Sequence, residues 1–221
     1  MASPRRVGAE TSKTRATLLD GTEQLILEAG YAAVTYRNVA AKAGVTGGLV
    51  QYYFPTLDDL FLALLRRRSD ANLERLLAAL EERPDEPLRI IWEFNTDETS
   101  AGLMMEFLAL ANHRKSIRSE IAEVTRRARK VQVDALAARW PQYASSAEGL
   151  SPGSLLFLMA TVPKMMLLEE SVGIAAAHDD VLRLVEQYLD SVEPTRAPRR
   201  MQTKRPAKRK SPARRRHGSS T

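Results

Sequence analysis

The twenty residues from Thr35 to Phe54 restrict the possible folds more than any other stretch of this chain. Gly44 lies near the middle of the stretch, where a residue with positive φ ends a helix at little cost. Thr46 follows two residues later and can cap a second helix, because its hydroxyl accepts a bond from a free backbone amide. The apolar positions have a spacing that two crossing helices can bury between them; they are Val39, Ala40, Ala43, Val45, Val50 and Phe54. The stretch therefore predicts two helices joined by a tight turn, the layout of a helix-turn-helix.

The outward face of the second helix has a composition that suits contact with DNA. Helix N-terminal amides and a threonine hydroxyl suit a phosphate, and the adjacent glycines let backbone approach closely. Gln51 can pair with an adenine edge, and Leu49 can contact a thymine methyl group. The residues expected to point outward are Thr46, Gly47, Gly48, Leu49, Gln51, Tyr52 and Tyr53. The alternative is an ordinary two-helix corner whose polar face is merely solvated.

Residues 14–60 resemble the DNA-binding domain of the TetR/AcrR family of bacterial repressors. The resemblance covers about a fifth of the chain, and the C-terminal part is similar only in length and helical layout. It rests on the segments Leu25–Tyr31, Thr35–Ala43, Gly44–Thr46, Tyr53–Phe54 and Leu60–Phe61. Arg37, near the start of the helix before the turn, is a candidate phosphate or base contact, and Thr35 is a further candidate DNA contact.

Three residues depart from the family pattern. Gln51 stands where the family usually has Tyr, Leu57 stands where a phosphate-binding Lys normally opens the fourth helix, and Gly47 replaces a common polar or basic residue. These departures leave the predicted fold intact. They leave open which bases are read and how strongly DNA is bound.

The positive charge of the chain is concentrated at its C-terminal end. Eleven of the 33 Lys and Arg residues follow Glu193, and no acidic residue does, so the rest of the chain has 22 basic and 27 acidic residues. The formal net charge of +6 is therefore a property of this tail and does not by itself support DNA binding by the helix-turn-helix. Residues 195–221 cannot bury a core and are predicted to be a disordered basic tail.

The chain is predicted to be all-α, with about nine helices, the number that the family resemblance implies. The apolar positions follow a helical period and show no strand alternation. The expected organisation is a flexible arm (1–12), a three-helix helix-turn-helix domain (13–56), a ligand-binding and dimerisation domain (57–194) and the basic tail. The predicted helices outside the motif span 14–29, 57–82, 87–99, 101–113, 117–140, 151–170 and 178–192, and residues 141–152 form a polar connection.

Several features argue against an enzyme, a metal site, a cofactor site or a membrane protein. The chain contains no cysteine and has three scattered histidines, none at a metal-binding spacing. The first fifteen residues lack the apolar segment of a secretory signal. The longest apolar stretch, Leu155–Leu168, is interrupted by Pro163 and Lys164 and is too short to span a bilayer. We therefore expect a cytoplasmic protein without catalytic residues.

The C-terminal half concentrates methionine and aromatic side chains, interrupted by polar residues. Methionine adapts its shape and often lines variable pockets, although a stripe of this kind is also typical of an ordinary core. The family resemblance implies a small-molecule cavity in this domain, for an apolar or amphipathic effector. The candidate ligand-binding residues are Trp92, Asn95, Met104, Met105, Leu108, Asn112, Met159 and Met166.

The last two helices carry more apolar positions than the edge of one subunit needs, among them Leu158, Leu182 and Leu184. The family resemblance implies a two-fold dimer through a four-helix bundle at these helices. A palindromic double-stranded DNA operator also demands a dimer.

Together these features predict a sequence-specific transcriptional regulator, in the form of a ligand-responsive homodimeric repressor. An architectural DNA-binding protein that uses mainly its basic tail is one alternative. A ligand-binding protein with weak operator recognition is another.

Overall fold

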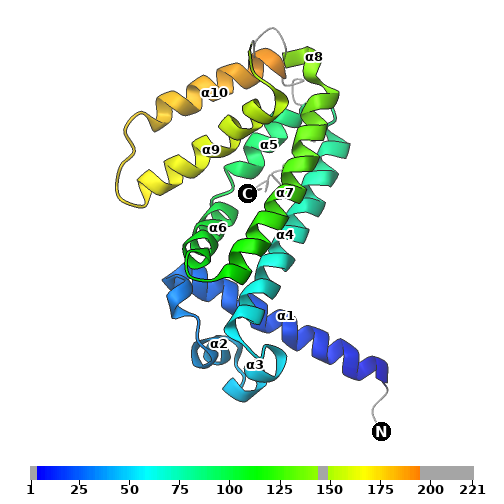
Figure 1. The fold of residues 1–221 in the computed structure, drawn as a ribbon, viewed down its shortest axis with the longest axis vertical. Helices are drawn as coiled ribbons and strands as arrows, with labels where there is room; N and C mark the ends of the chain where they lie inside the picture. The colour runs from blue at the N-terminus through cyan, green and yellow to red at the C-terminus, as the bar shows by residue number, and fades with distance from the viewer. Residues whose placement is uncertain (1–3, 144–148, 195–221) are drawn as a thin grey trace, which may run out of the picture.

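The computed structural model describes residues 4–143 and 149–194, with side chains from residue 13 onward. Within these residues the regular structure is entirely helical, as the sequence predicts, with ten α-helices and one short 3₁₀ helix (Figure 1). The elements are α1 (Pro4–Ala29), η1 (Tyr31–Ala33), α2 (Tyr36–Ala43), α3 (Gly47–Tyr53), α4 (Leu57–Glu82), α5 (Pro87–Asn95), α6 (Glu98–Ala111), α7 (Lys115–Ala138), α8 (Trp140–Tyr143), α9 (Pro152–Glu170) and α10 (His178–Val192).

The long helix α4 runs from the small N-terminal head, formed by α1, α2 and α3, into the body of the molecule (Figure 1). α4 begins directly after Thr56. The side chain of Thr56 accepts from the backbone N–H of Asp59, and the Asp59 carboxylate accepts from the N–H of Thr56. This reciprocal pair satisfies two backbone amides that the first turn of a helix leaves free. α4 and α7 lie side by side along most of their length.

The buried residues form two cores. The first core joins the head to α4, α6 and α7; Val50, Phe61 and Phe107 belong to it, and the rings of the last two meet edge to face at 6.4 Å. The second core lies between α5, α7, α8, α9 and α10 and contains Trp92 and Leu189. The packing of the head is therefore continuous with α6 and does not end at the predicted division between residues 56 and 57.

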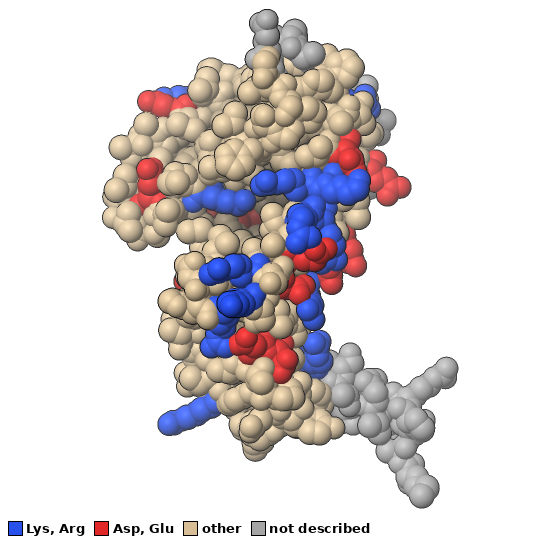
Figure 2. Space-filling model, viewed as in Figure 1, with Lys and Arg blue, Asp and Glu red and all other residues tan. Residues whose placement is uncertain are grey.

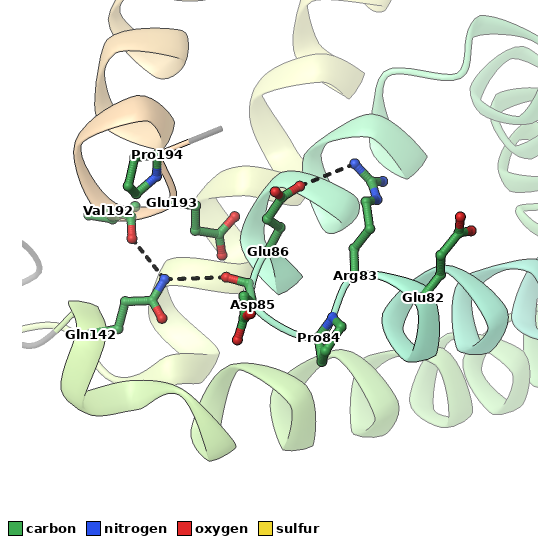
Figure 3. Close-up of a pocket in the computed structure, with 9 residues that line it drawn as sticks. All are labelled: Glu82, Arg83, Pro84, Asp85, Glu86, Gln142, Val192, Glu193 and Pro194. Atoms are coloured by element: carbon green, nitrogen blue, oxygen red, sulfur yellow. Dashed lines mark hydrogen bonds and ion pairs between the residues drawn. The ribbon is translucent and has the colours of Figure 1, made fainter. Parts of the chain in front are cut away.

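A buried glutamate closes the second core at the end of α10 (Figure 3). Glu193 is 1% exposed, and its two carboxylate oxygens accept the N–H groups of Leu88 and Arg89, each at 2.7 Å. The Tyr143 hydroxyl also donates to this carboxylate. Since Leu88 and Arg89 lie in the first turn of α5, Glu193 caps a helix that lies more than a hundred residues earlier in the chain.

Several predicted boundaries differ from the structure. Residues 4–12, predicted to be part of a flexible arm, belong to α1, because Pro4 suits a first helical turn and no second proline interrupts the segment before Leu18. The predicted polar connection at 141–152 contains α8, which forms because Tyr143 is completely buried. α5 ends at Asn95 instead of residue 99, since Asp97 caps α6 by accepting from the N–H of Ser100. The predicted basic tail at 195–221 lies outside the described residues.

Candidate nucleic-acid interface and ligand cavity

The turn between α2 and α3 has the predicted geometry. Gly44 ends α2 in the left-handed region, with φ at 67°. Thr35 caps α2 by accepting from the N–H of Asn38 at 3.1 Å, and Thr46 caps α3 by accepting from the N–H of Leu49 at 3.4 Å. Val50 is completely buried and fixes the rotation of α3 about its own axis. The opposite side of α3 is therefore presented to solvent.

The nine predicted DNA contacts lie on the head, and none of them is buried. The exposed members are Thr35, Arg37, Thr46, Gly48, Gln51 and Tyr52, and the half-buried ones are Gly47, Leu49 and Tyr53. Tyr52 is 77% exposed and contacts the ring of Tyr53 edge to face. A large aromatic side chain this open to water, beside Gln51 and at the tip of the head, gives α3 the composition of a recognition surface.

The sequence reasoning missed a tyrosine that holds α3 in place. The Tyr36 hydroxyl donates to the carbonyl oxygens of Pro55 at 2.8 Å and Phe54 at 3.2 Å, and so ties the start of α2 to the end of α3. Burial raises the pKa of Tyr36, and the nearby Asp59 raises it further, so the hydroxyl stays a donor at neutral pH. No signal within the motif indicates this bond, because its acceptors are backbone carbonyls eighteen and nineteen residues later.

Basic side chains flank this surface. Arg37 is exposed at the start of α2, and the guanidinium of Arg15 lies 5.3 Å from the centre of the Phe54 ring. Lys42 is less available to a phosphate, since its ammonium contacts Glu28 at 2.7 Å. The head thus offers cationic groups from α1 and α2 for the backbone of a nucleic acid.

A cavity of about 340 Å³ lies between α4, α5, α6, α7 and α9. Its volume falls at the lower end of the range of about 300–1,000 Å³ that small-molecule sites span. Apolar side chains supply much of its wall, with amide and hydroxyl groups between them. Both α4 and α6 contribute to the cavity and to the core of the head, which places the two sites on shared helices.

Three of the eight predicted ligand-binding residues line this cavity, namely Asn95, Met104 and Leu108. Trp92 and Met159 instead lie in the second core, because α5 and α9 turn those faces toward each other. Met105, Asn112 and Met166 are not part of the cavity wall either. On α6 the wall is formed by Ser100, Ala101, Met104 and Leu108. Ser100, Met104 and Leu108 repeat every four residues, so Met105 falls on another face.

A larger crevice of about 770 Å³ lies at the far end of the body, between the α4–α5 turn and Pro194 (Figure 3). Gln142 lines this crevice, and its side-chain amide donates to the carbonyl oxygens of Val192 at 2.7 Å and Asp85 at 3.5 Å. The crevice is formed by turns and helix ends, and four carboxylate side chains line it. It touches the long helix α4 only at its last residue, Glu82, far from the head, whereas the smaller cavity is lined by residues of both α4 and α6, so the smaller cavity is the better candidate for an effector site.

A direct link joins α6 to the head. The carboxylate of Glu106 accepts from the backbone N–H of Tyr31 at 2.7 Å, where the chain turns after α1. Gly30 makes this turn with φ at 76°, and a Cβ at that position would lie 3.2 Å from the same carboxylate. No sequence pattern indicates the bond, because the two residues are 75 positions apart.

The faces of α9 and α10, and the loop between them, expose many large apolar side chains. They include Phe157, Leu158, Met165, Leu168, Val172, Ile174, Leu182 and Leu184. The loop is held by His178, whose ring nitrogens lie 2.8 Å from Glu169 and 3.2 Å from Glu170. The two carboxylates raise the pKa of His178 through these hydrogen bonds. Among the described helices, none is both long and apolar enough to cross a membrane.

Comparison with known proteins agrees with this geometry. Residues 18–64, which hold the C-terminal part of α1 together with α2, α3 and the start of α4, match the family model for bacterial regulatory proteins of the tetR family. The chain is 30% identical over 141 residues to the transcriptional repressor BepR of Brucella suis, covering 60% of this chain and 66% of BepR. It is 37% identical over 100 residues to the transcriptional regulator BetI of Burkholderia thailandensis, covering 43% of this chain and 51% of BetI.

Similarity in structure extends over most of the fold. A transcriptional regulator from Saccharomonospora viridis, crystallised in complex with choline, matches with a TM-score of 0.64 over 81% of this chain and 94% of its own, at 18% identity. The curated relatives match over about two thirds and half of their own lengths, whereas this structural match includes the helices of the body. The helix-turn-helix, the all-helical body and these similarities together show that the chain belongs to the tetR family of bacterial regulatory proteins.

Proposed function

We propose that this protein is a ligand-responsive transcriptional regulator that binds a palindromic operator as a homodimer and has no catalytic activity. The observation that carries the proposal is the construction of the head. Capped helices and a buried Val50 hold α3 so that Gln51 and Tyr52 face outward. The names of BepR and BetI, a repressor and a regulator, support the same function.

In this proposal α3 enters the major groove and the head makes two kinds of contact. Gln51 and Leu49 read base edges, whereas Arg37 and the N-terminal amides of α3 bind phosphates. The hydroxyl of Thr46 accepts from Leu49 and keeps its proton to donate to a phosphate. The remaining predicted contacts, Thr35, Gly47, Gly48, Tyr52 and Tyr53, shape the surface that approaches the duplex.

The dimer is proposed to form through α9 and α10. Phe157, Leu158 and Leu184 are 54%, 48% and 66% exposed in a single chain, which is costly for apolar side chains in water. A second copy related by a two-fold axis would bury the same residues on both chains. Two heads would then face one side of the duplex, about one helical turn apart.

Ligand binding is proposed to reach the head through α6 and α4. Met104 and Leu108 line the cavity on one face of α6, and Glu106 holds the N–H of Tyr31 on another. At the start of α4, Asp58 accepts from the Ser116 hydroxyl at 2.7 Å and pairs with Arg114, and these contacts lower the pKa of Asp58. A ligand that moves α6 relative to α4 therefore changes the position of the head. The coupling is reciprocal, so operator DNA must change ligand affinity by the same factor.

The test uses Gln51→Ala and a matched control, Gln24→Ala, which removes an exposed glutamine from α1 of the same head. Binding of each full-length protein to an operator selected from random duplexes is measured by fluorescence anisotropy. Gln51→Ala should lose about 1–3 kcal/mol of discrimination at one base pair of each half-site. Gln24→Ala should bind like the unmodified protein. Equal base preferences in the unmodified protein and Gln51→Ala would refute the assigned role of α3.

A further inference from the structure

The wall of the cavity between α4, α5, α6, α7 and α9 carries charge of one sign only. Its charged lining residues are Arg127, Arg129 and Lys164, and no Asp or Glu lines it. Arg127 is neutralised by Asp70, which its guanidinium contacts at 3.2 Å. Arg129 and Lys164 form no ion pair with any of the described residues. Two cationic groups therefore face the cavity without a protein counter-charge.

Lys164 is placed at the cavity by an otherwise apolar helix. In α9, Leu156, Ala160 and Lys164 repeat every four residues and line the cavity together. The lysine side chain is open to solvent at the cavity, yet the surrounding protein desolvates its ammonium group and lowers its pKa. Arg129 lowers the pKa of Lys164 further, since two like charges lie close together. A bound anion would offset both the desolvation of the ammonium group and its repulsion by the Arg129 guanidinium.

The rest of the wall suits the apolar part of a ligand. Leu73, Leu76, Phe94, Met104 and Ile121 supply aliphatic, aromatic and thioether surface from four helices. Asp97 does not line the cavity, and its carboxylate accepts from the backbone N–H and the hydroxyl of the wall residue Ser100. In the space-filling view, Lys and Arg side chains gather across the hollow between the upper and lower parts of the molecule (Figure 2).

We propose that the effector is an anionic amphiphile, with its single anionic headgroup between Lys164 and Arg129 and its apolar body against Phe94, Met104 and Leu76. This assignment rests on the proposed function of the cavity as the effector site. The proposed ligand differs in charge from the one crystallised with the structurally similar regulator, because choline is a cation. A quaternary ammonium in this cavity would meet two unpaired positive charges and no carboxylate.

The experiment compares ten-carbon probes that differ only in their headgroup. Decanoate, decyl phosphate, decanol and decyltrimethylammonium are titrated into the full-length, DNA-free protein by isothermal calorimetry, below their aggregation concentrations. At least one of the two anions should bind, and both the alcohol and the cation should bind more weakly than that anion. The better of the two anions identifies a carboxylate or a phosphate as the preferred headgroup. The proposal is overturned if neither anion binds, or if the cation binds as tightly as the better anion.

Two variants and a matched control locate the headgroup. Lys164→Met and Arg129→Gln should each weaken binding of the better anion by about tenfold to a hundredfold, because each removes a hydrogen bond to a charged group. Arg126→Gln should leave binding of the anion unchanged. Arg126 lies on α7, as Arg129 does, but it is exposed, pairs with Glu123 and does not line the cavity. Lys164→Met should bind decanol at least as tightly as the unmodified protein does. Lys164→Arg should retain binding of the anion, and its failure to do so, or unchanged anion binding in Lys164→Met, would overturn the proposal.

The calorimetric result is independent of DNA binding. A protein that binds the anion but no operator supports this inference and contradicts the proposed function. A protein that binds an operator and releases it only to the cationic probe supports the proposed function and overturns the inference.

Discussion

Replacing Glu193 tests whether a single carboxylate joins α5, α8 and α10. The Glu193→Ala change removes the acceptor of three donors: the N–H groups of Leu88 and Arg89 and the hydroxyl of Tyr143. Leu88 and Tyr143 are completely buried, so water cannot replace the lost acceptor without opening the core. Arg89 itself is not left uncompensated, because its guanidinium contacts Asp190 at 2.7 Å and Glu186 at 3.3 Å.

The expected loss of stability follows from the three hydrogen bonds that Glu193→Ala removes. Each buried donor left without an acceptor costs about 1–3 kcal/mol, and part of the sum is regained because a desolvated carboxylate is no longer buried. We expect Glu193→Ala to lower the free energy of unfolding by about 3–5 kcal/mol at neutral pH. Glu193→Gln keeps one acceptor oxygen and should cost about 1–2 kcal/mol. Glu186→Ala, which removes a half-exposed partner of Arg89, should cost less than about 1 kcal/mol.

The contribution of Glu193 to the free energy of unfolding changes with pH in a defined direction. Burial raises the pKa of Glu193 above its ordinary value, although the tyrosine hydroxyl and the two amides act in the opposite direction. A raised pKa means that the native state binds the proton more tightly than the unfolded chain. The resulting stabilisation is complete below the unfolded-state pKa of about 4.3 and is lost as the pH rises through the native-state value. The cost of Glu193→Gln should therefore be larger at acid pH than at neutral pH.

The assay is urea unfolding followed by circular dichroism, at one protomer concentration for all variants, because dimerisation adds to apparent stability. The reasoning is refuted if Glu193→Ala costs no more than Glu186→Ala. The inference that folding raises the pKa of Glu193 is refuted if the cost of Glu193→Gln increases from acid to neutral pH.

Three further predictions concern coupling, assembly and charge. Glu106→Gln should leave operator affinity of the ligand-free protein nearly unchanged and reduce the ligand-induced change in that affinity by about 1 kcal/mol, measured by anisotropy with and without ligand; an unchanged ligand effect contradicts the role of α6. Leu184→Glu should convert the dimer to a monomer in light scattering, whereas Leu27→Glu, at an exposed leucine of α1, should not; a Leu184→Glu dimer contradicts the interface. Truncation after Pro194 removes eleven Lys and Arg residues and should give a shallower dependence of affinity on salt, on operator and random DNA alike, with the operator preference retained; unchanged salt dependence contradicts a role of the tail in DNA binding.

The features that could be predicted from the sequence are those determined by neighbouring residues. Gly44, Thr46 and Thr56 act within one turn of their own position, and the structure confirms each as a helix end or cap. The last helix has the predicted bounds, because its apolar residues recur every three or four positions over His178–Val192. The resemblance of residues 14–60 to a known family is confirmed by the match over residues 18–64.

The features that could not be predicted depend on distant parts of the chain. The bonds of Glu106 to Tyr31 and of Glu193 to Leu88 span 75 and 105 residues, and neither acceptor differs locally from a solvated glutamate. The residue type of Trp92 predicts a place in the cavity wall, but the packing of α5 on α9 buries this side chain in the second core. Lys164 did leave a signal, since a single lysine interrupts an otherwise apolar stretch. Its role at the cavity becomes visible only when α7 brings Arg129 beside it.

Selection of bound duplexes from a random library, followed by footprinting of the selected site, tests the central claim most directly. The account predicts an inverted repeat whose half-sites are about 34–36 Å apart, protected as one short segment by the full-length protein. Two α3 helices related by a two-fold axis require this symmetry. Recovery of no preferred sequence, or uniform protection along the DNA, would contradict the account and indicate binding through charge alone.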